Sequence, residues 1–249
     1  MPDYFYILIL FAIGIFAGFL NVTAGGGSTL TLPALIFLGL DSALANGTNR
    51  VAILIQNITA VFSFKKEKFQ QFDISLKLSL LTLPGSLLGA ILAVELSDEF
   101  FQKILGIIMI GIIISMILPQ KNITDSQHDS KKIPLSAYFT MIGIGFYGGF
   151  IQVGVGFILM AALQRLMKLN LVYVNMHKVF IIFVYTIPAL LIFVLTDNVN
   201  WGLGLALAAG NATGGWWAAK FSVKKGEKLI KYVLIVAVLI MSLKLLGVI

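Results

Sequence analysis

Long apolar stretches follow one another along most of the chain, and short polar segments separate them. Several of the stretches approach or exceed the roughly 18 residues that indicate a membrane-spanning helix. Because backbone groups in lipid must pair within their own segment, the pattern predicts an all-α polytopic membrane protein. The predicted helices are 4–23, 28–40, 43–64, 74–95, 100–118, 134–153, 156–167, 171–195, 199–220 and 228–247.

Two of the predicted helices, 28–40 and 156–167, are much shorter than the others. Each would be roughly 20 Å long at the α-helical rise, and a bilayer core is about 30 Å thick. We therefore expect eight long transmembrane helices and two short half-helices or re-entrant segments. The predicted organisation is an N-terminal repeat at 1–118, a cytoplasmic linker at 119–133 and a C-terminal repeat at 134–249.

A glycine-rich hairpin precedes each short helix, at 18–27 and at 149–156. At one offset of 131 residues, Gly18 matches Gly149, Asn21 matches Gln152 and Gly25 matches Gly156. Weaker echoes match Asn46 with Asn175 and Gly89 with Gly215. Paired hydrophobic segments broken by glycine are typical of transporters built from inverted-topology repeats, with the substrate site at the breaks.

Lysine and arginine concentrate in alternate loops, which orients the chain in the membrane. The cationic loops 65–68, 119–133 and 224–228 are expected in the cytoplasm, and the loops at 95–99 and at Asp197 outside. The loop after the third segment is then inside in the first half and outside in the second. The two halves are therefore predicted to be inverted, with both termini outside.

The composition of the chain excludes further classes of protein and of functional site. The chain is 59% hydrophobic and only 12% charged, against about 25% charged in soluble domains. Its formal charge of +7 comes mainly from the short loops, so topology explains it and no nucleic-acid partner is expected. The absence of cysteine excludes disulfides, thiolate metal sites and cysteine nucleophiles. No cofactor is predicted.

Small-residue spacings recur inside the apolar segments. The run Gly143-Ile144-Gly145-Phe146-Tyr147-Gly148 matches a dinucleotide-binding fingerprint literally, but it has no strand before it and no acidic residue about 20 positions later. We interpret it, with the pairs Gly14/Gly18 and Gly145/Gly149, as close helix packing. Such packing fits contacts within one chain or at the face of a homodimer.

Other motifs resemble a known family. A Gly25-Gly26-Gly27 triplet is followed by Pro33 in the short helix and then by the run 45–49, which reads Ala-Asn-Gly-Thr-Asn. With the second hairpin and a glycine-rich penultimate helix at Gly210, Gly214 and Gly215, this pattern resembles the sulfite exporter TauE/SafE family over nearly the whole chain. The resemblance implies a carrier of the cell inner membrane with a duplicated helix bundle, associated with export of sulfite or small organosulfur anions. The second hairpin departs from the pattern, because Val155 interrupts its glycines.

The two glycine-rich hairpins have features that favour binding of an anion. Residues 25–28 and 154–157 lead into the short helices, whose first N–H groups are unpaired and carry partial positive charge. Glycine lets the backbone approach a ligand closely. Two such helix starts converging in an inverted repeat would form an anion cradle. The alternative is that the glycines serve helix packing alone.

The positions of the ionisable residues also indicate a negatively charged ligand. All acidic residues lie within a few positions of a segment end, whereas Arg50, His177 and Lys178 lie deep in their segments. A charged group at that depth is costly and suggests function. Position-matched halves place Asn49 opposite Lys178 and Thr48 opposite His177. Cations, amides and hydroxyls without carboxylates suit an oxyanion.

Each deep residue also has a simpler interpretation. Arg50 and Lys178 would reach opposite membrane surfaces by snorkelling, and His177 would be a packed core residue. If transport is coupled to protons, we expect His177 or the substrate itself to titrate. The predicted substrate-binding residues are Asn21, Gly25, Gly26, Gly27, Ser28, Thr48, Asn49, Arg50, Gln152, Gly154, Gly156, Asn175, His177 and Lys178; no catalytic residue or metal ligand is predicted.

Three functions are compatible with this pattern. The first is a secondary transporter of a small anion, which contacts membrane lipid and uses alternating access. The second is an anion channel, which needs a continuous pore. The third is an intramembrane enzyme, which we do not expect because no Ser–His–Asp set, metal-ligand cluster or pair of carboxylates can be assembled at depth.

Overall fold

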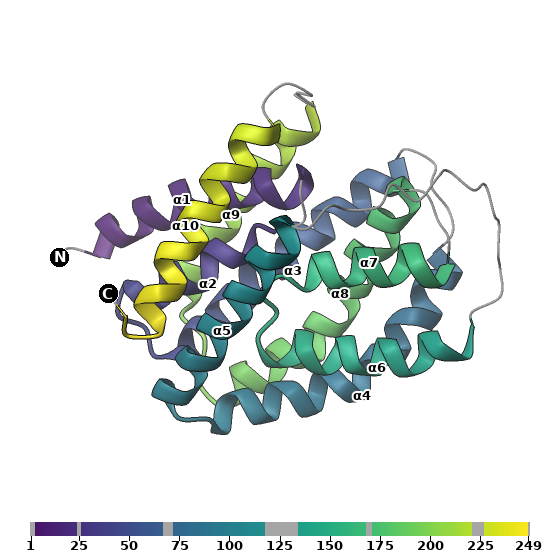
Figure 1. The fold of residues 1–249 in the computed structure, drawn as a ribbon, viewed down its shortest axis with the longest axis horizontal. Helices are drawn as coiled ribbons and strands as arrows, with labels where there is room; N and C mark the ends of the chain where they lie inside the picture. The colour runs from purple at the N-terminus through teal and green to yellow at the C-terminus, as the bar shows by residue number, and fades with distance from the viewer. Residues whose placement is uncertain are drawn as a thin grey trace.

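The computed structural model describes residues 3–23, 26–66, 72–117, 134–167, 171–220 and 227–248. In this part of the chain all regular secondary structure is α-helical, as predicted (Figure 1). The helices are α1 (Asp3–Thr23), α2 (Ser28–Phe37), α3 (Ser42–Lys66), α4 (Phe72–Glu95), α5 (Asp98–Ile117), α6 (Leu135–Phe150), α7 (Val155–Met167), α8 (Leu171–Leu195), α9 (Trp201–Lys220) and α10 (Glu227–Leu245).

Most helix boundaries agree with the predicted ones within a few residues, and two are corrected. The helix predicted over 28–40 ends at Phe37, because Gly39 turns the chain with a φ of 96°. The helix predicted over 134–153 ends at Phe150, because Gln152 and Gly154 have φ values of 65° and 71°. Left-handed backbone of this kind cannot continue a right-handed helix. The helix α6 therefore ends inside the predicted hairpin 149–156, three residues before the predicted helix end.

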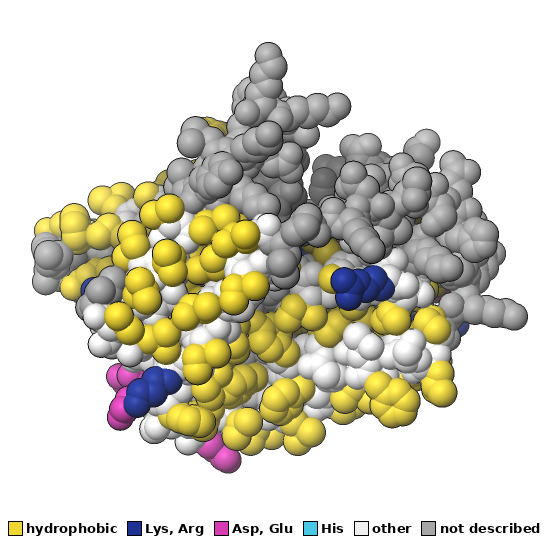
Figure 2. Space-filling view, in the orientation of Figure 1, with side chains coloured by type: hydrophobic (Ala, Val, Ile, Leu, Met, Phe, Trp, Pro, Cys, Tyr) yellow, Lys and Arg dark blue, Asp and Glu magenta, His cyan; other side chains and the backbone are white. Residues whose placement is uncertain are grey.

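Four helices of the described chain, α1, α4, α5 and α8, are both long and apolar enough to cross a membrane. α3 is as long as α8, at 25 residues, but its polar side chains lower its hydropathy, and α6 has only 16 residues. Figure 2 shows hydrophobic side chains spread widely over the visible surface. Many hydrophobic side chains of the described residues are more than half exposed, such as those of Leu88, Ile107 and Phe139. These features describe a polytopic membrane protein. The count of eight long spanning helices stays a prediction.

Two pairs of helices cross in very close contact, α1 with α9 and α4 with α6. Glycine makes both crossings possible. A Cβ added to Gly145 would lie 2.1 Å from the carbonyl oxygen of Thr82, and one on Gly210 would lie 2.2 Å from that of Phe11. Any larger residue would have to push two backbones apart, so small residues set the distance between these helices.

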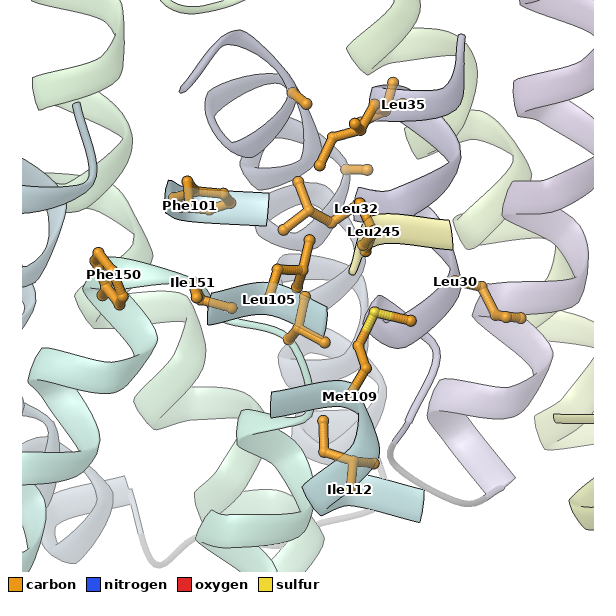
Figure 3. Close-up of a cluster of buried hydrophobic side chains, with 14 of the residues drawn as sticks. Leu30, Leu32, Leu35, Phe101, Leu105, Met109, Ile112, Phe150, Ile151 and Leu245 are labelled. Carbon is orange, nitrogen blue, oxygen red and sulfur yellow. The ribbon is translucent and has the colours of Figure 1, made fainter. Parts of the chain in front are cut away.

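The central helices α3 and α8 pack against each other and connect the two crossed pairs, since α3 also contacts α9 and α8 also contacts α4. Beside them, α2 and α5 share a buried hydrophobic cluster with the second hairpin and α10 (Figure 3). In this cluster Phe101 of α5 meets Phe150 edge-on, with ring centroids 5.8 Å apart. The second hairpin is therefore packed inside the protein, against α5.

Candidate functional site

The second hairpin, between α6 and α7, is buried throughout residues 150–156. The amide nitrogens of Ile151 and Gln152 both donate to the carbonyl of Tyr147. The Tyr147 hydroxyl in turn donates to the carbonyl of Val153. Gln152 is one of only two described non-glycine residues with a positive φ. Such conformations persist where the surroundings impose them, and they cluster at functional sites.

Arg50 of α3 reaches this hairpin and is fully buried. Its Nη1 donates to the carbonyl of Gly148 at 3.0 Å and to Oε1 of Gln152 at 2.9 Å. Its Nη2 donates to the carbonyl of Gly149 at 2.5 Å. The Nε has no hydrogen-bond partner in the described part of the chain. With an exposed fraction of 0% and its fork turned inward, Arg50 does not snorkel in this structure.

Arg50 acts together with Asn46, one helical turn earlier in α3. The Asn46 Nδ2 donates to the carbonyl of Phe150 at 2.6 Å, so the two side chains bind the last three carbonyls of α6. A helix ends with unpaired carbonyls and partial negative charge, which a cation stabilises. The ring of Phe193 completes the setting, because its centroid lies 4.8 Å from Cζ of Arg50.

Gln152 joins Arg50 to α8. Its Oε1 accepts from Arg50, and its Nε2 donates to Oγ1 of Thr186 at 3.3 Å. Thr186 and the adjacent Tyr185 are both fully buried. Sequence analysis missed these two residues, because they lie in the apolar run 171–195. The one available signal was that the corresponding positions of the first half are polar, namely Gln56 and Asn57.

The second hairpin contacts the start of α2, the helix that follows the first hairpin. The amide of Gly154 donates to Oγ of Ser28 at 3.2 Å, and Ser28 is the first residue of α2. Gly27 precedes it without a side-chain cap on the helix. A Cβ on Gly27 would lie 2.1 Å from the carbonyl of Ala17, so this glycine is also required for packing on α1. Gly26 is buried and its carbonyl accepts the Thr29 hydroxyl. Gly25 lies outside the described residues.

The other predicted site residues are held at different places. The Thr48 hydroxyl accepts from the amide of Asn200 at 2.9 Å, in the segment before α9. Nδ1 of His177 lies 2.7 Å from Oγ of Ser75 in α4, and its Nε2 has no partner in the protein. Asn49 and Gly156 are buried, and Asn21 and Asn175 are partly buried.

Lys178 does not share the guanidinium's contacts. Its Nζ lies 3.8 Å from Sδ of Met160 in α7. Lys178 and Thr186 are separated by about 12 Å along α8 at the helical rise. The structure thus joins Arg50, Gln152, Gly154 and Ser28 in one chain of contacts and holds Lys178 further along α8.

The centre of the protein contains many polar groups that the protein itself does not pair. Buried polar atoms normally have a partner. The buried side-chain atoms without one belong to Thr31, Ser42, Asn46, Asn49, Arg50, Gln56, His177, Tyr185 and Asn211. Among the described residues the ion pair found joins Lys103 to Glu99 at the start of α5, and no carboxylate pairs with Arg50 or Lys178. Those that are hydrogen-bond donors, such as Nε of Arg50, Nδ2 of Asn49 and the hydroxyl of Tyr185, can bind oxygen atoms of an anion.

Comparison with known proteins identifies the family. Residues 10–245 match the family described as "Sulfite exporter TauE/SafE". The chain belongs to this family. It is 30% identical over 243 residues to the probable membrane transporter protein YfcA of Escherichia coli K12, covering 96% of this chain and 88% of that protein. It is 26% identical over 237 residues to a probable membrane transporter protein of Haemophilus influenzae, covering 95% and 93%.

A more distant relative is the probable membrane transporter protein YunE of Bacillus subtilis, which is 25% identical over 263 residues and covered over 96% of both chains. No solved structure matches this TauE/SafE chain. The family and these relatives make it a membrane transporter and not an enzyme, as the sequence predicted.

Proposed function

We propose that this TauE/SafE protein is a secondary transporter that exports a small oxyanion, either sulfite or a small organosulfur anion. The observation that carries the proposal is Arg50, a fully buried cation bound to the second hairpin without a carboxylate among its described partners. A buried charge that lacks a counter-ion is costly. An anionic substrate would supply that counter-ion while it is bound.

We further propose alternating access between two inverted repeats, 1–118 and 134–249, joined by the linker 119–133. The packing supports this arrangement, because exchanging the halves converts the α1–α9 crossing into the α6–α4 crossing and leaves the α3–α8 contact in place. The close contacts agree residue by residue. Gly14 of α1, which packs against α9, corresponds to Gly145 of α6, which packs against α4. Gly89 corresponds to Gly214, whereas the sequence match was with Gly215.

The substrate class is tested by flux into proteoliposomes that contain the purified full-length protein. We offer sulfite, sulfate, methanesulfonate and acetate, and expect saturable sulfite or sulfonate flux that is stimulated by the same anion on the opposite side. Flux that does not saturate and lacks trans-stimulation would instead indicate a channel. Acetate flux above that of all sulfur oxyanions would contradict the proposed substrate class.

Topology is predicted from the lysine asymmetry, with both termini outside and the loops 65–68 and 119–133 inside. The structure supports placing the termini together, since α1 begins and α10 ends on the same side of the molecule (left in Figure 1). Because the chain has no cysteine, single replacements at Lys65, Ser97 and His128 need no altered background. A membrane-impermeant thiol reagent on intact cells should label S97C alone. Labelling of K65C or H128C with S97C protected would contradict the inverted topology.

A further inference from the structure

Tyr185 is a second polar group at the second hairpin, and nothing so far gives it a role. It lies in α8 with an exposed fraction of 0%, and its hydroxyl has no hydrogen-bond partner among the residues that the structure describes. Burying a hydroxyl without a partner destabilises a fold. An apolar phenylalanine would fill the same volume without that cost, so a hydroxyl at this position calls for a partner from outside the chain.

The tyrosine is placed against the hairpin by Gly148. A Cβ added to Gly148 would lie 2.7 Å from Cζ and 2.8 Å from the hydroxyl oxygen of Tyr185. Only glycine leaves room for the ring there. The hydroxyl therefore lies beside the same residue whose carbonyl accepts from Nη1 of Arg50 at 3.0 Å.

Arg50 brings a second unused donor to this place. A guanidinium has five N–H groups, and three are used on Gly148, Gly149 and Gln152. The Nε–H is buried and unpaired. The side chains that carry these two unpaired donors, Arg50 and Tyr185, thus both lie against Gly148 of α6.

Gln152 provides Arg50 with a hydrogen-bond acceptor when no anion is bound. Its neutral Oε1 accepts a hydrogen bond from the guanidinium at 2.9 Å. The backbone of Gln152 is held at a φ of 65°. A carboxylate at this position would neutralise Arg50 permanently and compete with any anion. An amide oxygen leaves the charge in place.

We propose that the Tyr185 hydroxyl and the Nε–H of Arg50 bind two oxygen atoms of one oxyanion, which makes Tyr185 a substrate-binding residue. The inference rests on the proposed function, since it assigns a donor to the same transport site. It also specifies the ligand. Two donors from different helices suit an anion with at least two oxygens on one centre, such as sulfite or a sulfonate, and discriminate against chloride.

Tyr185→Phe tests this inference in the purified full-length protein in detergent, with sulfite, methanesulfonate and chloride as titrants. Removing one hydrogen bond to a charged ligand is expected to weaken sulfite binding roughly 10- to 100-fold. Because the hydroxyl has no partner in the fold, the melting temperature without anion should stay the same or rise. Tyr147→Phe is the matched control, because its hydroxyl does bond to the hairpin, and its melting temperature should fall.

A second variant tests the anion's position independently. Gln152→Glu would place a carboxylate beside Nη1 of Arg50, and it should retain the fold but bind sulfite at least about tenfold more weakly. Wild-type sulfite affinity in either variant would overturn the inference and leave the proposed function standing. A lower anion-free melting temperature for Tyr185→Phe would also overturn it, because the hydroxyl would then be structural. If the wild type bound no sulfur oxyanion at all, the proposed function would fail, and this inference with it.

Discussion

Sulfite flux is expected to fall at least about tenfold when Arg50 is replaced by lysine, because each hydrogen bond to a charged group is worth about 1.5–3 kcal/mol and lysine cannot form all of those that the guanidinium forms. Lysine keeps the charge but loses the planar fork. A single ammonium cannot reproduce the guanidinium's contacts with Gly148, Gly149 and Gln152 while also offering an Nε–H. The measurement is initial flux in proteoliposomes, normalised to the amount of inserted protein.

The matched control is Arg165→Lys. Arg165 is the other arginine of the chain and lies exposed in α7, so its replacement should leave flux and affinity at the wild-type level. Insertion into the membrane should be normal for both variants. Because Arg50 also binds the end of α6, its variant is expected to melt at a lower temperature as well. Wild-type sulfite flux and affinity in Arg50→Lys would place the substrate away from this side chain and leave the hairpins as packing elements.

A second large effect is expected at a helix crossing, where Gly145→Ala should strongly reduce the yield of folded protein. The added Cβ would lie 2.1 Å from the carbonyl oxygen of Thr82 in α4. Backbone atoms cannot rotate away as a side chain does, so α4 and α6 would have to separate along their contact. Overpacking typically costs 1–3 kcal/mol and occasionally more, and a backbone clash belongs at the upper end. Thermal unfolding in detergent and the monodisperse fraction on size-exclusion chromatography measure the effect.

Gly143→Ala controls for this prediction on the same helix. A Cβ at Gly143 would meet nothing within 4 Å, and the residue is exposed. Since alanine favours helix over glycine by roughly 1 kcal/mol, this variant should melt at the wild-type temperature or above it. Equal behaviour of the two alanine variants would mean that α4 and α6 do not approach as closely as the structure has them.

The sequence alone determined where the helices lie and what kind of protein they build. Apolar runs near the thickness of a bilayer core leave few alternatives to membrane helices, because unpaired backbone groups are not tolerated in lipid. Glycine and polar residues broke these runs at 18–27 and 149–156, and the structure has the second break between α6 and α7. Residues 24 and 25 of the first break lie outside the described residues. Arg50 could also be singled out, since a cation inside an apolar run must find partners within the protein.

The ends of the short segments were harder to predict. Gly39 is a recognisable helix terminator, yet the predicted helix ran past it to residue 40. Nothing local indicated that Gln152 would take a left-handed conformation. That conformation is stabilised by contacts with Arg50 and Thr186, which are 102 and 34 residues away in the sequence.

Only the tertiary structure decided which groups meet at the candidate site. Arg50 and Lys178 looked like two halves of one anion site, but Arg50 binds the end of α6 and Lys178 lies against Met160 of α7. Tyr185 could not be distinguished from other aromatic residues of its apolar helix until Gly148 was seen to lie against its hydroxyl. The lipid-facing and the buried sides of these helices are both apolar, so hydrophobicity alone does not select the face that packs on another helix. The partner helix and the height at which they cross depend on glycine contacts between segments far apart in the chain, and these contacts bring an arginine, a glutamine and a tyrosine together.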